Sequence, residues 1–141
     1  MRLNIVKRRT PSIARFNKKE WRNADTEHYG RPQDFSETQF RIVAREKNGI
    51  IGSLKLRIKL GVCEVQSIIV GKKLRGTGVG SALMEKAEQI ARKRGIHKLW
   101  LETGKGWAAE KFYRKLGYRK NTVLPKHYAK RDFILYEKML R

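Results

Sequence analysis

The fold of this protein is decided by the stretch Val70-Gly71-Lys72-Lys73-Leu74-Arg75-Gly76-Thr77-Gly78-Val79-Gly80-Ser81. It joins an apolar run, residues 68–70, to an amphipathic segment, residues 77–94, so it predicts a tight connection between a buried strand and a helix. Glycines let the backbone approach a ligand closely, and the free N–H groups at the start of a helix attract anions. The loop therefore indicates a site for a phosphate or pyrophosphate group, with a simple strand-to-helix turn as the alternative.

The segments on either side of this loop predict a mixed sheet. Residues 40–45 and 53–60 alternate apolar and polar side chains around Asn48-Gly49, which predicts a hairpin with one basic face. Residues 63–70 end in a near-continuous apolar run, which is typical of a central strand covered on both faces. Beyond the helix at 77–94 we expect a strand at 99–101, a helix over 109–116 that ends at Gly117, and strands at 118–122 and 133–139.

The N-terminal part carries weaker signals. Residues 3–7 predict a short first strand, and Thr10-Pro11-Ser12 begins a helix toward Trp21. The aperiodic residues 23–37 predict a loop with room for one helical turn. No repeat or linker interrupts the chain. We therefore expect one α/β domain over residues 1–141, with an antiparallel front half and one strand-helix-strand crossover.

The composition limits the possible functions. The chain has 141 residues, with 34 Lys and Arg against 13 Asp and Glu, and a net charge of +21. Such a field implies a polyanionic ligand, an acidic protein partner or nucleic acid. The single cysteine, Cys63, excludes an internal disulfide, and the three histidines lack metal-ligand spacing, so we expect no metal. Neither a long apolar run nor a secretory signal is present, so we expect a cytoplasmic protein without a membrane segment.

Two other anion-binding loops fit the glycines less well. A nucleoside triphosphate loop needs Gly-Lys-Ser/Thr at its end, and no lysine follows Gly76 or Gly78 in that place. A dinucleotide fingerprint needs a third glycine where Ser81 stands, and a longer parallel sheet than one crossover builds. Glu102 could stand for the ribose-binding acid of that fingerprint, so it is kept as a weaker alternative.

A third pattern fits both this loop and a later segment. The run 70–80 resembles the signature of the Gcn5-related N-acetyltransferases (GNAT), an Arg/Gln-x-x-Gly-x-Gly/Ala loop five residues beyond a strand-ending valine. The segment Ala109-Glu110-Lys111-Phe112-Tyr113-Arg114-Lys115-Leu116-Gly117-Tyr118 is similar to that family's second motif, Ala-x-x-Phe-Tyr-x-x-x-Gly-Phe/Tyr. The resemblance covers residues 64–118 well. It implies a mixed, mostly antiparallel sheet with helices on both faces, and transfer of an acetyl group from acetyl-coenzyme A to an amine by direct attack in a ternary complex.

The resemblance also implies which residues bind the cosubstrate. The pantetheine arm would pair with the backbone of Ile68 and Val70, and an N–H group near Ile69 or Val70 would polarise the thioester carbonyl. The pyrophosphate would rest on backbone N–H groups of the loop, those of Arg75, Gly76, Thr77, Gly78, Val79, Gly80 and Ser81.

Two catalytic roles follow from ordinary pKa values. An amine is mostly protonated at neutral pH and must lose a proton, and a departing thiolate leaves more readily when an acid assists it. By the motif match Tyr113 is the general acid, although a buried helix aromatic is the alternative. Glu64, an acid within the central strand, is the candidate base, and an exposed acid paired with a lysine is an equal alternative. Glu102 is a weaker candidate.

One position departs from the family pattern. The asparagine that often precedes the motif tyrosine by seven residues is replaced by Gly106, which leaves open what holds the pantetheine arm. Trp107 could cover the acyl channel, or pack at the start of the helix. The loop containing His127-Tyr128 could contact the acceptor, and so could the acids of residues 21–35, namely Asp25, Glu27 and Asp34.

The acceptor stays open at this point. It is an amine on a small molecule or a protein, and the charge of +21 disfavours a polyamine or a lysine-rich peptide and favours an acidic or nucleic-acid-associated target. The alternatives are a non-catalytic acyl-coenzyme A sensor of the same fold and a basic nucleic-acid-binding module. Both a monomer and a homodimer are compatible with the sequence.

Overall fold

The computed structural model describes residues 1–141, which divide into two compact units, 1–35 and 36–141. The first unit contains α1 (Pro11–Tyr29). The Thr10 side chain accepts a hydrogen bond from the Ile13 N–H at 3.3 Å, and Gly30 ends the helix with a left-handed φ of 74°. The helix start is therefore where the Thr-Pro-Ser sequence predicts it. The expectation of one domain over the whole chain stays a prediction.

Two expectations for this unit are wrong. Residues 3–7 form no strand, because strands need a hydrogen-bonded neighbour and the alternating Leu3 and Ile5 are almost fully exposed. Residues 23–29, expected as loop, continue α1. No glycine or proline stands between Ser12 and Tyr29, so the helix runs on to the first breaker even though it lacks an apolar stripe.

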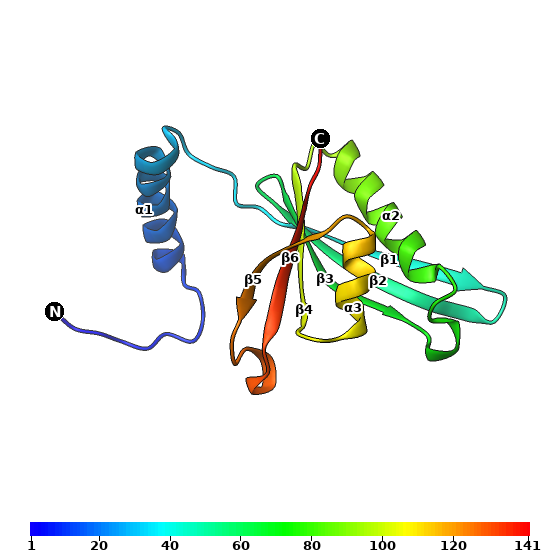
Figure 1. Ribbon diagram of the computed structural model, residues 1–141. Helices are drawn as coiled ribbons and strands as arrows, with labels where there is room; N and C mark the ends of the chain where they lie inside the picture. The colour runs from blue at the N-terminus through cyan, green and yellow to red at the C-terminus, as the bar shows by residue number, and fades with distance from the viewer. The chain divides into compact units, whose positions relative to one another are not determined.

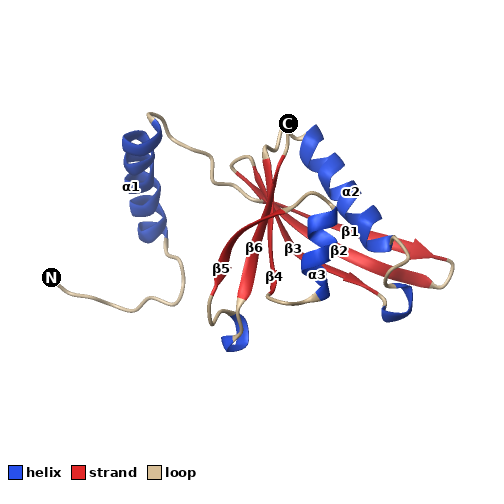
Figure 2. Cartoon of the chain, viewed as in Figure 1, coloured by secondary structure: helices blue, strands red, loops and turns tan.

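The second unit is built on a six-stranded sheet with the order β1-β2-β3-β4-β6-β5 (Figure 1, Figure 2). Only β3 and β4 are parallel, and every other neighbouring pair is antiparallel. This confirms the mixed, mostly antiparallel sheet with a strand-helix-strand crossover. The strands are β1 (Thr38–Glu46), β2 (Gly49–Lys59), β3 (Val62–Val70), β4 (Lys98–Gly104), β5 (Arg119–Leu124) and β6 (Phe133–Met139).

Both longer helices of this unit pack on one face of the sheet (Figure 1). They are α2 (Val79–Lys93), between β3 and β4, and α3 (Ala108–Lys115), between β4 and β5. The core lies between this face and the helices, where Met84 and Ala87 of α2 and Tyr113 of α3 meet Leu99 and Tyr136. Two short 3₁₀ turns, η1 (Lys72–Leu74) and η2 (Tyr128–Lys130), lie in the loops. None of the helices is both long and apolar enough to cross a membrane.

The sheet opens between its two parallel strands. β3 pairs with β4 only from Val62 opposite Lys98 to Glu64 opposite Trp100. Next to this point the pairing of β3 with β2 shifts register between Lys55 and Leu56, as an extra residue in β3 requires. Residues 66–70 therefore have a free edge on the β4 side. The expectation that this strand is covered on both faces is wrong at Ile69, which is 59% exposed.

Candidate functional site

The glycine-rich loop between β3 and α2 is held by its own backbone. The Gly71 N–H donates to the Ile51 carbonyl at 2.8 Å, and the Thr77 hydroxyl donates to the Leu74 carbonyl at 2.5 Å. Gly76 and Gly78 adopt left-handed φ values of 77° and 96°, which a residue with a side chain adopts only under strain. Gly78 is the N-cap of α2 and offers no side-chain cap, so the first N–H groups of α2 stay available to an anion.

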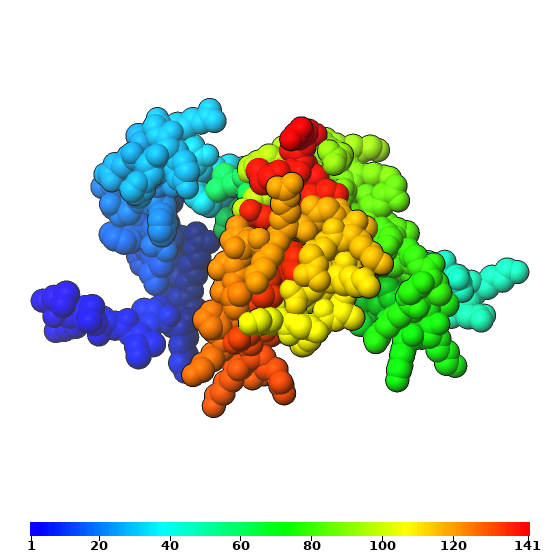
Figure 3. Space-filling view, viewed as in Figure 1, coloured from blue at the N-terminus to red at the C-terminus, as the bar shows by residue number.

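A cavity of about 620 Å³ lies where the sheet opens. We call it the glycine-loop cavity. In Figure 3 the segment around residues 70–81 (green) lies beside α3 (yellow), and these two segments form its walls. Its lining residues are Ile68, Ile69, Val70, Leu74, Arg75, Gly76, Gly78, Gly80 and Ser81 on one side, and Ala108, Ala109, Phe112, Tyr113 and Lys115 on the other.

The structure thus brings together most of the expected cosubstrate residues. Thr77 and Val79 are the exceptions: neither lines the cavity. The Thr77 hydroxyl is bound to Leu74, and Val79 packs against the core. A Cβ at Gly80 would lie 3.3 Å from the Phe112 ring, so a larger residue there would require that ring to shift by a few tenths of an ångström.

Tyr113 lies at the wall of this cavity and is 6% exposed. Its ring packs against those of Phe112 and Tyr118, at centroid distances of 5.2 and 6.0 Å. Burial raises the pKa of Tyr113 to about 12, so the hydroxyl keeps its proton throughout the physiological range. The residue is thus the buried aromatic of α3 and also lines the cavity, and its role as general acid stays a prediction.

Glu64 does not line the glycine-loop cavity. It occupies the last β3 residue that pairs with β4, and its carboxylate lies 2.6 Å from the Arg57 guanidinium. Glu102 lies two residues beyond the opposite residue, Trp100, along β4. Its carboxylate is 3.5 Å from His127 Nε2 and has no lysine or arginine partner. The two carboxylates that the sequence singles out therefore differ in whether a cation neutralises them.

The position of the missing asparagine, Gly106, belongs to a different network. The Gly106 N–H donates to one oxygen of Glu110 at 2.6 Å, and the Tyr136 hydroxyl donates to the other at 2.6 Å. These hydrogen bonds, first that from Tyr136, hold the pKa of Glu110 below its ordinary value. They fix the turn that leads into α3.

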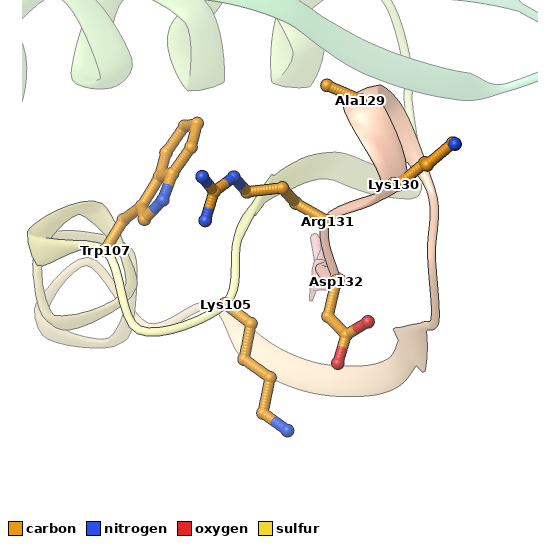
Figure 4. A pocket seen from close by; sticks show the side chains of 6 residues that line it. All are labelled: Lys105, Trp107, Ala129, Lys130, Arg131 and Asp132. Atoms are coloured by element: carbon orange, nitrogen blue, oxygen red, sulfur yellow. The ribbon is translucent and has the colours of Figure 1, made fainter.

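Trp107 lies outside the glycine-loop cavity. Its ring lies so close to Gly104 that a Cβ at that position would overlap the indole, and it meets Phe133 edge-on at 5.6 Å. It lines a second cavity of about 410 Å³, together with Lys105, Ala129, Lys130, Arg131 and Asp132 (Figure 4).

Aromatic rings extend from this second cavity to Glu102. The Phe133 ring lies 5.0 Å from Tyr128 and 5.9 Å from His127, measured between centroids. We call the set Trp107, His127, Tyr128 and Phe133 the aromatic strip. The sequence points to Trp107 and to His127-Tyr128 separately, but it gives no signal for Phe133 or Arg131, because only the pairing of β4 with β6 brings these residues together.

The remaining candidates have simple structural roles. Burial raises the pKa of the Cys63 thiol to about 11, as expected for a core residue and not for a nucleophile. Asp25 is buried within the first unit, where its carboxylate accepts a hydrogen bond from the Gln33 N–H at 3.3 Å. Contact of Asp25, Glu27 or Asp34 with an acceptor stays a prediction.

Comparison with known proteins identifies the family. The profile of the acetyltransferase (GNAT) family matches residues 10–118, and the chain belongs to this family. An uncharacterized N-acetyltransferase of Methanocaldococcus jannaschii is 40% identical over 68 residues, which are 47% of this chain and 30% of that protein. The match thus spans less than a third of that relative.

Solved structures share the fold. An acetyltransferase from Bacillus cereus has a TM-score of 0.72 at 22% identity, over 97% of this chain and 98% of that one. A GNAT family acetyltransferase from Elizabethkingia anophelis, whose crystal structure has acetyl-CoA bound, has a TM-score of 0.66 at 23% identity, over 71% of this chain and 75% of that one. The expected family and fold are therefore confirmed.

Proposed function

We propose that this protein is an N-acetyltransferase that moves the acetyl group of acetyl-coenzyme A to a primary amine by direct attack in a ternary complex. The observation that carries the proposal is the glycine-loop cavity, which joins a helix N-terminus, the free edge of β3 and a buried tyrosine in one space. The relative from Elizabethkingia anophelis, crystallised with acetyl-CoA, supports the choice of cosubstrate.

The loop and the strand edge divide the binding of the cosubstrate. N–H groups between Arg75 and Ser81 bind the pyrophosphate, and the cationic side chains of Lys72, Lys73 and Arg75 add attraction. The backbone of Ile68 and Val70 pairs with the amides of the pantetheine arm, because β4 no longer occupies that edge. An N–H group near Ile69 or Val70 donates to the thioester carbonyl oxygen as negative charge develops there.

During the transfer one proton must leave the amine nitrogen, and the charge on the departing sulfur must be stabilised. The nitrogen of the neutral amine bonds to the acetyl carbon and the carbon–sulfur bond breaks, while the nitrogen gives up a proton. We assign Glu64 as the acceptor of the amine's proton, with the Arg57 ion pair fixing its orientation. The Tyr113 hydroxyl donates a hydrogen bond to the departing sulfur. Since its pKa is about 12, it stabilises the thiolate by hydrogen bonding and stays protonated itself.

Binding of the cosubstrate tests the first half of this proposal. Acetyl-coenzyme A at about a hundred times its dissociation constant should add about 2.7 kcal/mol of stability, which raises the melting temperature by several degrees. NAD and a short nucleic-acid duplex at the same salt concentration should not reproduce that shift. A salt-sensitive shift with the duplex alone would support the nucleic-acid-binding alternative.

Turnover tests the second half. Release of free thiol from acetyl-coenzyme A should depend on an added amine, measured over a panel of small amines and peptide N-termini. Glu64→Gln should lower kcat and leave the affinity for acetyl-coenzyme A unchanged. A protein that binds acetyl-coenzyme A but releases no thiol with any acceptor would be a sensor and not an enzyme.

A further inference from the structure

The sheet face opposite the helices carries an acid, Glu102, with no lysine or arginine partner. Along β4, Leu101 and Thr103 are buried toward the helices, so the alternating Glu102 points to the opposite face. In a chain with a net charge of +21, its carboxylate lies 3.5 Å from His127 Nε2 and is hydrogen-bonded to Tyr128, but it forms no ion pair with a lysine or arginine. The negative charge of Glu102 and a hydrogen bond to it raise the pKa of Tyr128. Because no lysine or arginine neutralises it, this carboxylate is a local negative charge that attracts a cationic group placed against it.

A cation without an acid lies at the other end of the aromatic strip. In Figure 4 the guanidinium of Arg131 points across the second cavity toward the Trp107 ring, while Lys105 extends away from it. None of the three cations that line this cavity, Lys105, Lys130 and Arg131, forms an ion pair. Arg131 is therefore free to bind an anion, and a planar guanidinium suits a carboxylate or a phosphate.

The loop that holds Arg131 is strained. Ala129 and Lys130 have left-handed φ values of 51° and 60°, and Lys126 has one of 47°. Non-glycine residues rarely adopt such values, and each costs roughly 1 kcal/mol or more. The loop is held closed by the His127 N–H, which donates to the Arg131 carbonyl at 2.8 Å, and by the Lys126 N–H, which donates to the Asp132 carboxylate at 3.0 Å. The strain is concentrated where Arg131 and His127 are presented.

Between these two charges lies a surface for an apolar group. Trp107 and Tyr128 are 56% and 59% exposed, yet both pack on Phe133. Exposed rings that are held in place by their neighbours offer rigid contact area at low entropic cost. The aromatic strip therefore connects a carboxylate that has no lysine or arginine partner to a guanidinium that has no acidic partner.

From this arrangement we infer that the acceptor is an amphoteric amine, a molecule that carries an ammonium group and a carboxylate or phosphate separated by an apolar spacer. Glu102 binds the ammonium, the aromatic strip binds the spacer and Arg131 binds the anionic group. This inference rests on the proposed function, since it names the substrate class of the same transferase. It also agrees with the charge of the chain, because a net positive field attracts an acceptor that carries an acid.

The placement suits direct attack. Tyr113 lies on the helix-covered face of the sheet and Glu102 on the other. Between them β3 and β4 are no longer paired. Once the ammonium bound at Glu102 has lost a proton to solvent, the neutral amine can reach a thioester that lies in the opening, while the sulfur leaves toward Tyr113.

Three probes of one shape test the inference: para-(aminomethyl)benzoate, which has both charges, para-methylbenzylamine, which has the ammonium alone, and para-toluate, which has the carboxylate alone. Their binding to the full chain is measured by calorimetry, with and without coenzyme A. We expect para-(aminomethyl)benzoate to bind at least about tenfold more tightly than either other probe, since one charge-assisted contact is worth that factor.

Single substitutions test which residue binds each charged group of the probe. Arg131→Gln should remove the preference for para-(aminomethyl)benzoate over para-methylbenzylamine, and Glu102→Gln should weaken both amines but not para-toluate. Arg119→Gln is the matched control, because Arg119 is exposed on β5, forms no ion pair and lies outside the second cavity. Equal affinity for all three probes, no binding of any probe, or equal effects of the two arginine variants would overturn the inference.

Acetyl-coenzyme A binding and thiol release are followed in the same samples, so that the two proposals can be told apart. Loss of the probe preference with intact acetyl-coenzyme A binding contradicts only the acceptor class. Absence of acetyl-coenzyme A binding contradicts the proposed function itself.

Discussion

The glycine-loop cavity and the aromatic strip are assembled in different ways. The first is built almost entirely from two continuous segments, residues 68–81 and 108–115, each of which carries a motif. The second draws single residues from the turn before α3, the β5–β6 loop and the start of β6. The proposed cosubstrate site can thus be found in the sequence, whereas the proposed acceptor site emerges only when distant strands pair.

The two regions also differ in what holds them. Backbone hydrogen bonds and glycines with left-handed φ values fix the loop of the glycine-loop cavity, so that a side chain added at Gly76 or Gly78 strains the backbone. Ring contacts and one carboxylate fix the aromatic strip, so that single side chains can change without loss of the backbone shape.

The largest effect is expected at Tyr113. Tyr113→Phe keeps the ring that packs on Phe112 and removes only the hydroxyl, so kcat should fall by about a hundredfold or more while the affinity for acetyl-coenzyme A is unchanged. Steady-state kinetics with calorimetry measures both. Because burial raises the pKa of Tyr113 to about 12, the wild-type rate should show no loss from ionisation of this hydroxyl up to about pH 10. An unchanged kcat would assign the hydroxyl to packing alone.

A second prediction concerns the loop backbone. Gly76→Ala places a side chain at a φ of 77°, and Gly95→Ala does the same at 69°, with open space around both positions. Each should lower the free energy of unfolding by about 1 kcal/mol. Only Gly76→Ala should also weaken acetyl-coenzyme A binding, by roughly tenfold. Equal affinities for the two variants would show that the loop is a turn and not an anion site.

The aromatic strip has its own probe at Gly104. Gly104→Ala introduces a Cβ that overlaps the Trp107 ring, so the indole must move. We expect the KM for the acceptor to rise several-fold, with a change in tryptophan fluorescence and no change in acetyl-coenzyme A affinity. A change in both affinities would mean that the two regions are coupled and would break the comparison.

The smallest effect should appear as a pH dependence of stability. The pKa of Glu110 is lowered in the folded chain, so its ionised form stabilises the fold above its ordinary pKa of about 4.5, and that stability is lost as the pH falls below it. Chemical unfolding of the wild type and of Glu110→Gln should differ by roughly 1 kcal/mol at pH 7. The difference should shrink toward pH 3. A difference that is constant with pH would assign the effect to geometry and not to charge.

Periodicity was sufficient for the sheet and for the two helices that cover it, because each of those elements buries a regular apolar face. Periodicity failed in two segments of the N-terminal unit, in opposite ways. Residues 3–7 alternate without a neighbouring strand to pair with, and residues 23–29 are helical without an apolar stripe. Ile69 shows the same limit, because an apolar residue in the central strand is left exposed where β4 diverges.

By itself the sequence determined the mixed sheet and the strand-helix-strand crossover that begins with the glycine loop. It also determined the candidate anion site in that loop and the position of Tyr113 on α3. These features depend on residues close together in the chain, where backbone conformation and helix spacing act directly. Only the tertiary structure decided that Glu64 forms an ion pair with Arg57, whereas Glu102 has no lysine or arginine partner. It also decided that the Phe133 ring lies between those of Trp107 and His127. Those relations depend on strand register and on where β3 and β4 separate, and register is a property of paired strands that neither strand specifies alone.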